Sequence, residues 1–326
     1  MRAPLTRVPL ARDPPAETFY FPIETGPYRM AMGLTTVPIS EWFEIDALYT
    51  VEIAERRRLL AADRHAMFGV TPGAEAACAE TLASVMAHLT AHYPDWFQCD
   101  NGVLRYHLTG EVWDIAAHDP LELAGRLVQE DLCVIEASPE GPRLSAAVLC
   151  FPSRWRLHEK LGRPLALVHE AVPFYAERLA RPVDRFMARV GTGAVSARLN
   201  WSVLDDAALF QPSGKWREAH DPSVTPENAG ERLFLRVERQ TLRRLPVTGA
   251  ILFGIRVHVY PMTRVAETGG AAVLAAAIRA LPAATAHYKS LPAFQAALLD
   301  WLDRQGGAAP GWPTASFPTK SGPTTV

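Results

Sequence analysis

Strand-like runs of apolar residues fall into two groups in the middle of the chain, separated by two helix-like stretches. A segment of Ser, Pro, Glu and Gly between the first two runs predicts a hairpin, and a turn that starts at Pro246 joins the last two. The five predicted strands are residues 131–137, 144–151, 194–204, 232–245 and 250–260. The pattern therefore predicts an α+β fold, with an antiparallel five-stranded sheet and covering helices at residues 156–170 and 173–190.

Helical spacing returns on both sides of this core. Ser40 is a good N-cap for a helix that carries Trp42, Ile45, Tyr49 and Ile53. Further helices are predicted at residues 74–92, from Pro120 onward, at 273–281 and at 292–302. These additional N- and C-terminal helices divide the chain into three segments that we expect to form one compact unit: 1–130, 131–262 and 263–326.

The two ends of the chain are predicted to be irregular. Residues 1–40 are rich in proline and predict an arm packed across the body, with aromatic anchors at Phe19, Tyr20, Phe21 and Tyr28. The last twenty residues are rich in Gly, Pro and Thr and predict a flexible tail.

Composition excludes several classes of function. A hydrophobic content of 48% and a charged content of 21% over 326 residues are those of a globular protein. A net charge of −2 gives no electrostatic reason to expect nucleic acid or an anionic membrane, and the arginines at 56–58 read as the solvated face of a helix. No apolar run is long enough to span a bilayer, and the N-terminal segment lacks the apolar core of a signal peptide.

The cysteines argue against a metal cluster on this chain. All four are far apart and none forms a CxxC pair, so they predict neither a zinc site nor an iron–sulfur centre. They are expected to be reduced thiols in a cytoplasmic protein.

Polar residues recur at alternate positions on three of the predicted strands. If these strands are neighbours, the rows form one polar patch, which is either a functional pocket or the wet face of a half-buried sheet. Its members are Arg198, Asn200 and Ser202, then Arg236, Glu238 and Gln240, then Arg256, His258 and Tyr260.

His169 is the leading candidate for a metal ligand. It follows the apolar residues Leu165, Leu167 and Val168 on a helix-like segment that covers the sheet. A lone histidine in this setting is either a hydrogen-bonded structural residue or a ligand. His158 is the competitor, and its position beside charged residues predicts greater exposure.

Many short strings, in this order, resemble the alpha-subunit-like members of the haem-dependent oxidative N-demethylases. The strings extend over most of the chain, and their number and order carry the resemblance. They include Tyr28–Arg29–Met30, Trp42 with Asp46 and Tyr49, Glu130–Asp131–Leu132, Phe151–Pro152–Ser153 with Trp155, the run from Glu159 to Leu165, His169 with Val172 and Pro173, Arg198 with Asn200 and Trp201, and Glu238–Arg239–Gln240 before Leu245 and Pro246.

The resemblance implies a PAS-like haem protein that oxidises a small secondary amine, such as dimethylamine, to a primary amine and formaldehyde with O2. Haem b iron would be bound by His169, Glu238 would pair with the substrate ammonium, and Arg198 would donate a hydrogen bond to bound oxygen. Asn200, Trp201, Arg256 and His258 would complete the cofactor pocket, and Trp201 is also a candidate for a cation–π contact with the amine.

Electrons would have to come from another protein. The family's characterised system uses a reductase subunit with flavin and an iron–sulfur centre, and this chain has neither a GxGxxG motif nor a cysteine cluster. A separate reductase partner is therefore expected.

Two positions depart from the family's usual residues. Val247 occupies a turn where a basic residue is common, and His258 stands where a small hydroxyl residue is usual. Either change could alter the substrate or the activity. Two alternatives therefore remain: a non-catalytic haem- or gas-binding PAS protein, and a PAS-like protein that has lost haem. The lack of an attached signalling module favours the enzyme.

Overall fold

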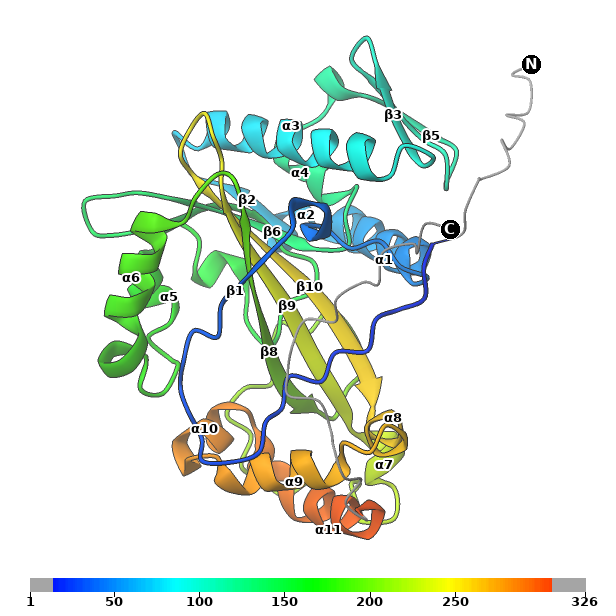
Figure 1. Cartoon of the computed structure of the whole chain (residues 1–326), viewed down its shortest axis with the longest axis vertical. Helices are drawn as coiled ribbons and strands as arrows, with labels where there is room; N and C mark the ends of the chain where they lie inside the picture. Colours follow the sequence, from blue (N-terminus) through cyan, green and yellow to red (C-terminus); the bar gives the residue numbers. More distant parts are fainter. Residues whose placement is uncertain (1–13, 307–326) are drawn as a thin grey trace, which may run out of the picture.

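The computed structural model describes residues 14–306. The predicted flexible tail and the beginning of the arm lie outside these residues. The protein is α+β, and its largest element is a seven-stranded antiparallel sheet (Figure 1). In spatial order, the strands are β1 (Thr35–Val37), β8 (Val195–Leu204), β9 (Phe234–Arg244), β10 (Ile251–Pro261), β6 (Asp131–Glu136), β7 (Arg143–Val148) and β2 (Phe68–Val70).

The five predicted strands are the five central strands of this sheet, in the spatial order β8-β9-β10-β6-β7. The edge strands β1 and β2 were not predicted, because three residues are too few to show alternation. A separate three-stranded sheet was also missed; it consists of β3 (Phe97–Asp100), β4 (Val103–Tyr106) and β5 (Glu111–Asp114).

An N-terminal helical layer covers one face of the large sheet. Its elements are η1 (Ile39–Glu41), α1 (Tyr49–Ala62), α2 (Arg64–Met67), α3 (Glu75–His92), η2 (Ile115–Ala117) and α4 (Pro120–Gly125). Helices α3 and α4 occur where they were predicted, and Asp119 caps α4 by accepting from the amides of Leu121 and Glu122.

The helix predicted to begin after Ser40 is wrong. Only the short turn η1 forms there, and α1 begins at Tyr49. Trp42, Phe43 and Ile45 are all buried, although Phe43 and Ile45 lie in no helix. This segment is therefore irregular and contributes side chains to the core.

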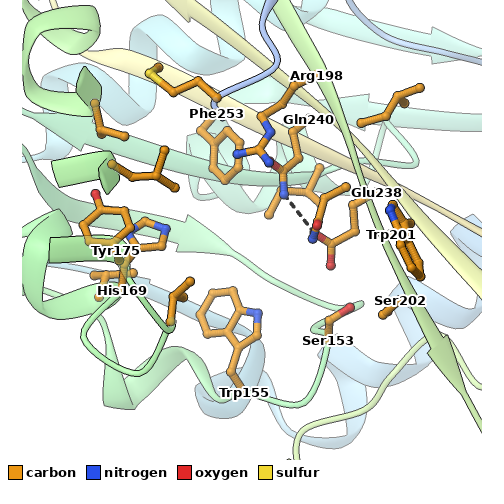
Figure 2. A pocket seen from close by; sticks show the side chains of 18 of the residues that line it. Ser153, Trp155, His169, Tyr175, Arg198, Trp201, Ser202, Glu238, Gln240 and Phe253 are labelled. Carbon is orange, nitrogen blue, oxygen red and sulfur yellow. Dashed lines mark hydrogen bonds between the residues drawn. The ribbon is translucent and has the colours of Figure 1, made fainter. Parts of the chain in front are cut away.

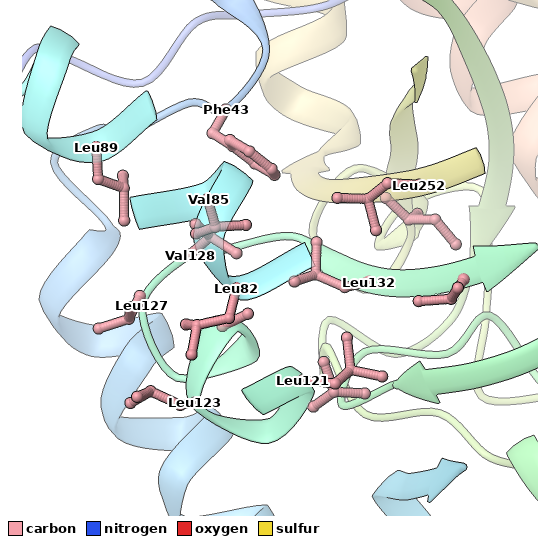
Figure 3. Packing of buried hydrophobic residues seen from close by; sticks show 14 of the residues in the cluster. Phe43, Leu82, Val85, Leu89, Leu121, Leu123, Leu127, Val128, Leu132 and Leu252 are labelled. Carbon is pink, nitrogen blue, oxygen red and sulfur yellow. The ribbon is translucent and has the colours of Figure 1, made fainter. Parts of the chain in front are cut away.

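The core between this layer and the sheet is built from aliphatic side chains. Leu82, Val85 and Leu89 of α3 pack toward Leu132 of β6 and Leu252 of β10 (Figure 3). A Cβ added at Gly125 would lie 2.3 Å from Val148 Cγ1, which shows how closely α4 approaches β7. This packing holds the sheet as a rigid back wall for whatever lies on its other face.

The crossover between β7 and β8 covers that other face. It consists of η3 (Leu157–Glu159), α5 (Leu165–Val168), the π-helical turn η4 (Tyr175–Leu179) and α6 (Ala180–Arg189). The continuous helix predicted over residues 156–170 is wrong, because Gly162 has a positive φ of 78° and Pro164 follows it. The first half of the crossover is therefore a series of short turns, whereas η4 and α6 together confirm the helix predicted over residues 173–190.

C-terminal helices pack at one end of the sheet (Figure 1). They are α7 (Ala229–Arg232), α8 (Met262–Glu267), α9 (Ala271–Ala280), α10 (Ala283–Tyr288), η5 (Leu291–Ala293) and α11 (Gln295–Gln305). Helices α9 and α11 confirm the helices predicted at residues 273–281 and 292–302. The described part of the arm crosses the body as predicted, with Tyr20, Phe21 and Ile23 buried. Within residues 14–306, no helix combines the length and apolarity needed to cross a membrane.

Candidate functional site

A cavity of about 490 Å3 lies between the sheet and the crossover. Strands β8, β9, β10, β6 and β7 contribute its back wall, while α5, η4 and α6 contribute the opposite wall. Residues 28–32 of the arm line a further side. The lining is mostly apolar with a few polar groups, and the volume is within the range of small-molecule sites.

His169 lines this cavity and presents one free ring nitrogen. Its Nδ1–H donates to the carbonyl of Leu165 at 2.8 Å, and its ring stacks on Tyr175 with centroids 4.6 Å apart. Burial lowers the pKa of His169 to about 4, so the imidazole is neutral at pH 7. Nε2 therefore carries a lone pair, and the hydrogen bond to Leu165 fixes the tautomer in the manner of metal-binding histidines.

His158, the competing candidate, does not line the cavity. It belongs to η3, and its side chain is exposed, as predicted from its charged neighbours. Of the two histidines, the fold brings only His169 to the cavity wall.

Glu238 lies on β9 and is held in the cavity as an anion by neutral donors. Gln240 Nε2 donates to Glu238 Oε2 at 2.8 Å, and Asn200 Nδ2 donates to the same oxygen at 3.3 Å (Figure 2). Burial alone would raise the pKa of Glu238, but the positive charge of Arg236 and the hydrogen bonds from Asn200 and Gln240 lower it overall. The carboxylate is thus ionised and has no ion pair among the described residues.

Arg198, Trp201 and Ser202 of β8 also line the cavity. Burial lowers the pKa of the Arg198 guanidinium, whose Nε has no hydrogen-bond partner within residues 14–306. Figure 2 shows Arg198, Gln240 and Glu238 projecting from neighbouring strands, with His169 and Tyr175 on the crossover. Polar donors, a carboxylate and a free imidazole therefore surround one space.

The expectation that the β10 row belongs to the same patch is wrong. Glu238 pairs with Asn200 on β8 and with Val257 on β10, so Arg256 and His258 point to the opposite face of the sheet. Paired residues share a face, and here even positions of β9 pair with odd positions of β10. Neither Arg256, His258 nor Tyr260 lines the cavity.

Arg256 and His258 instead belong to a buried ionic network beneath the N-terminal layer. Arg256 pairs with Asp46 at 2.8 Å and with Glu52 at 2.7 Å. His258 lies 3.3 Å from Glu44, and this contact helps to raise its pKa against the effect of burial. Their charges are satisfied locally, which fits a structural role.

Two further arginines differ from expectation. Arg236 shares the cavity face of β9, but its Nη2 donates to the carbonyl of Phe151 at 2.7 Å and its side chain does not line the cavity. Arg56, expected on a solvated face, is fully buried and pairs with Asp131 at 2.9 Å. Helical periodicity places Arg56 in line with Ile53 and Leu60, which is the signal that could have revealed its burial.

Cavity-lining residues on irregular segments were missed by sequence reasoning. Ser153, Lys215 and Lys289 line the cavity from loops and from the end of a short helix, where no periodic pattern predicts the direction of a side chain. Phe174 lies between two lining residues and has a left-handed φ of 63°. Such backbone strain in a residue other than glycine is commonly found at functional sites.

The fold and this site define a class: an α+β protein whose antiparallel sheet and helical crossover enclose a cavity with a neutral histidine and a half-buried carboxylate. The comparison with known families is more specific, since residues 33–299 match the family described as haem-dependent oxidative N-demethylase, alpha subunit-like. The match covers most of the chain, and the protein belongs to this family. The resemblance drawn from the short strings is thereby confirmed.

The residues present fit the haem for which the family is named. The free Nε2 of His169 is an imidazole donor of the kind that binds haem iron, and its Nδ1 is already engaged. Leu165, Val168, Leu179, Phe186 and Met187 supply apolar surface around it. Haem dependence is therefore compatible with the chemistry of the cavity lining.

Proposed function

We propose that this protein is the haem-binding catalytic subunit of an oxidative N-demethylase that acts on a small secondary amine such as dimethylamine. The observation that carries the proposal is the presence, in one cavity, of a neutral histidine with a free Nε2 and of an ionised carboxylate that forms no ion pair with any residue of 14–306. The five central strands and the crossover would form the PAS-like core, since two strands, helical segments and three strands follow in that order.

In this proposal, His169 binds the iron of haem b through Nε2. The hydrogen bond to Leu165 and the stack on Tyr175 orient the ring, so that little rotational freedom is lost on ligation. Bound haem supplies the chemistry of O2 activation, which no side chain of the cavity could supply alone. His169 stays neutral across the physiological pH range because burial lowers its pKa to about 4.

Glu238 would bind the substrate as an ammonium ion. Asn200 and Gln240 hold the carboxylate in place without neutralising its charge, so an ammonium ion that reaches Glu238 meets a carboxylate that has no ion pair among the described residues. Trp201 is a candidate for a cation–π contact, although Lys289 already lies 5.2 Å from the centre of its ring.

Arg198 and Gln240 would act as hydrogen-bond donors beside the reacting centre. Negative charge develops as oxygen is reduced, and donors already in place stabilise it without reorganisation. Asn200 and Gln240 both orient Glu238, so they would position the amine relative to these donors.

Electrons would come from a separate reductase that carries flavin and an iron–sulfur centre. The family name itself describes a subunit. The four cysteines of the chain are free and dispersed, which supports a cytoplasmic protein without a cluster of its own.

A spectroscopic titration tests the proposal. The protein is reconstituted with haem, and its visible spectrum is recorded with dimethylamine and with dimethyl ether, a neutral molecule of similar shape. We expect a Soret band that shifts with the amine and not with the ether, and formaldehyde after reduction with dithionite and exposure to air. A haem spectrum without an amine response would indicate a haem- or gas-binding protein, and no haem binding would indicate loss of the cofactor.

Variants assign the roles within this experiment. His169→Ala should abolish normal ligation, while His158→Ala, on the exposed histidine, is the matched control and should leave the spectrum unchanged. Glu238→Gln should keep haem but lower amine affinity by about tenfold or more, the effect of losing one charge-assisted contact. Unaltered ligation in the first variant, or unaltered amine affinity in the last, would refute the corresponding role.

A further inference from the structure

The distribution of lysine in this chain is uneven. The sequence has 29 arginines and only four lysines. Three of the lysines, Lys160, Lys215 and Lys289, line the cavity, and Lys320 lies outside the described residues. These three come from separate segments: the crossover after η3, the loop between β8 and α7, and the end of α10.

Each of the three ammonium groups lies over an aromatic ring. Lys160 Nζ is 4.5 Å from the ring centre of Trp155, and Lys215 Nζ is 4.9 Å from that of Tyr288. Lys289 Nζ lies over Trp201 and also donates to the carbonyl of that residue. An ammonium has three donors, so each lysine keeps at least one for a ligand.

None of these lysines forms an ion pair with a described residue, whereas many arginines of the chain pair with carboxylates. The cavity's uncompensated carboxylate, Glu238, is hydrogen-bonded by neutral side chains and not by a lysine. Arg198 adds a further cation that forms no ion pair within residues 14–306. Positive charge therefore exceeds negative charge along this wall.

Partly buried cations without counterions are unfavourable unless a ligand supplies the opposite charge. The effect is visible in the lysines themselves: burial, with the neighbouring Lys215, lowers the pKa of Lys160 to about 8, although Glu159 opposes it. Burial likewise lowers the pKa of Lys289 to about 8, with Glu238 opposing and Arg198 reinforcing the shift.

We infer that Lys160, Lys215 and Lys289 form an anion-binding edge of the cavity that takes the two carboxylates of a largely apolar ligand. The inference rests on the proposed function for the ligand's identity, since the two propionates of haem are such carboxylates. The apolar wall beside His169 takes the macrocycle, and the lysines take its charged side. A bound ligand would then connect the crossover, the β8–α7 loop and the C-terminal helices.

The test uses metal-free protoporphyrin IX and its dimethyl ester, which differ only in the two carboxylates and contain no iron for His169. Binding of each to the full chain is followed by quenching of tryptophan fluorescence. The variants are Lys160→Met with Lys215→Met, and separately Lys289→Met. Arg163→Met is the matched control, because Arg163 is a partly exposed cation on the crossover that does not line the cavity.

We expect the free acid to bind the wild type at least about tenfold more tightly than the ester, the scale of one or more charge-assisted hydrogen bonds. The lysine variants should lose most of this difference and bind the ester normally, which also shows that the cavity remains folded. Arg163→Met should behave as wild type. Equal binding of acid and ester, no binding of the acid, or an unchanged preference in the lysine variants would overturn the inference.

The experiments distinguish a wrong assignment of the anion-binding edge from a wrong proposed function. Amine response and ligation by His169 are read from the haem spectrum, whereas the preference for the acid is read without iron. A protein could thus bind haem and amine with no preference for the acid, or prefer the acid without any amine response.

Discussion

Glu130 offers a quantitative test of the buried network on the face of the sheet opposite the cavity. The residue is fully buried between the N-terminal layer and the sheet. Its Oε1 accepts from the amide of Glu44 at 2.9 Å, while its Oε2 has no hydrogen-bond partner among the described residues. Burial raises the pKa of Glu130 from 4.5 to about 7, although Arg256 and Arg239 oppose the shift.

The direction in which pH changes stability follows from the protonation of Glu130 in the folded and the unfolded chain. Below about pH 4.5, Glu130 is protonated whether the chain is folded or not, and it contributes no pH dependence. Between 4.5 and about 7, only the unfolded chain loses the proton, so the free energy of unfolding falls as pH rises. At about 1.4 kcal/mol per pH unit, the full loss is about 3 kcal/mol above pH 7.

Glu130→Gln should remove this loss, because the amide is neutral and its oxygen can still accept from Glu44. We expect the variant to unfold with a free energy about 3 kcal/mol higher than wild type at pH 8 and nearly equal to it at pH 4. Urea denaturation at several pH values measures the difference, and Glu140→Gln, on an exposed turn, serves as the control. A constant difference between pH 4 and pH 8, or a variant less stable at pH 8, would refute the reasoning.

Three further predictions concern other contacts. Arg56→Met should lower the free energy of unfolding by about 3–5 kcal/mol, because it leaves the Asp131 carboxylate buried without its ion pair. Adding Asp131→Asn should recover part of this loss. Urea denaturation that shows no such recovery would argue against a stabilising role of the ion pair. Gly125→Ala should destabilise by about 1–3 kcal/mol through the clash with Val148, whereas Gly191→Ala, with no atom near its added Cβ, should be nearly neutral in the same thermal unfolding assay. Because burial lowers the pKa of unligated His169 to about 4, protons do not compete with iron for its Nε2 near neutral pH, and the Soret band of the reconstituted protein should hold from pH 8 to about 5. A decline centred near 6.5 would show an imidazole that is not shielded.

Local pattern determined much of this protein. The alternation of apolar residues predicted the five central strands, and helical spacing located α3, α9 and α11, because each signal arises within a single element. His169 could be preferred over His158 for a similar reason: its neighbours are apolar, and those of His158 are charged. The resemblance to the family likewise depended on strings of residues that can be read without a structure.

Tertiary structure alone decided which residues share the cavity. The pairing of β9 with β10 joins even positions to odd ones, so Arg256 and His258 lie opposite Glu238 although all three fit one alternation pattern. The turn and the strand pairing set this register, and a shift of one residue reverses every side chain. The three lysines are separated by long stretches of chain and lie on irregular segments; only the folded backbone brings them to one wall, because nothing local specifies where a loop directs its side chains.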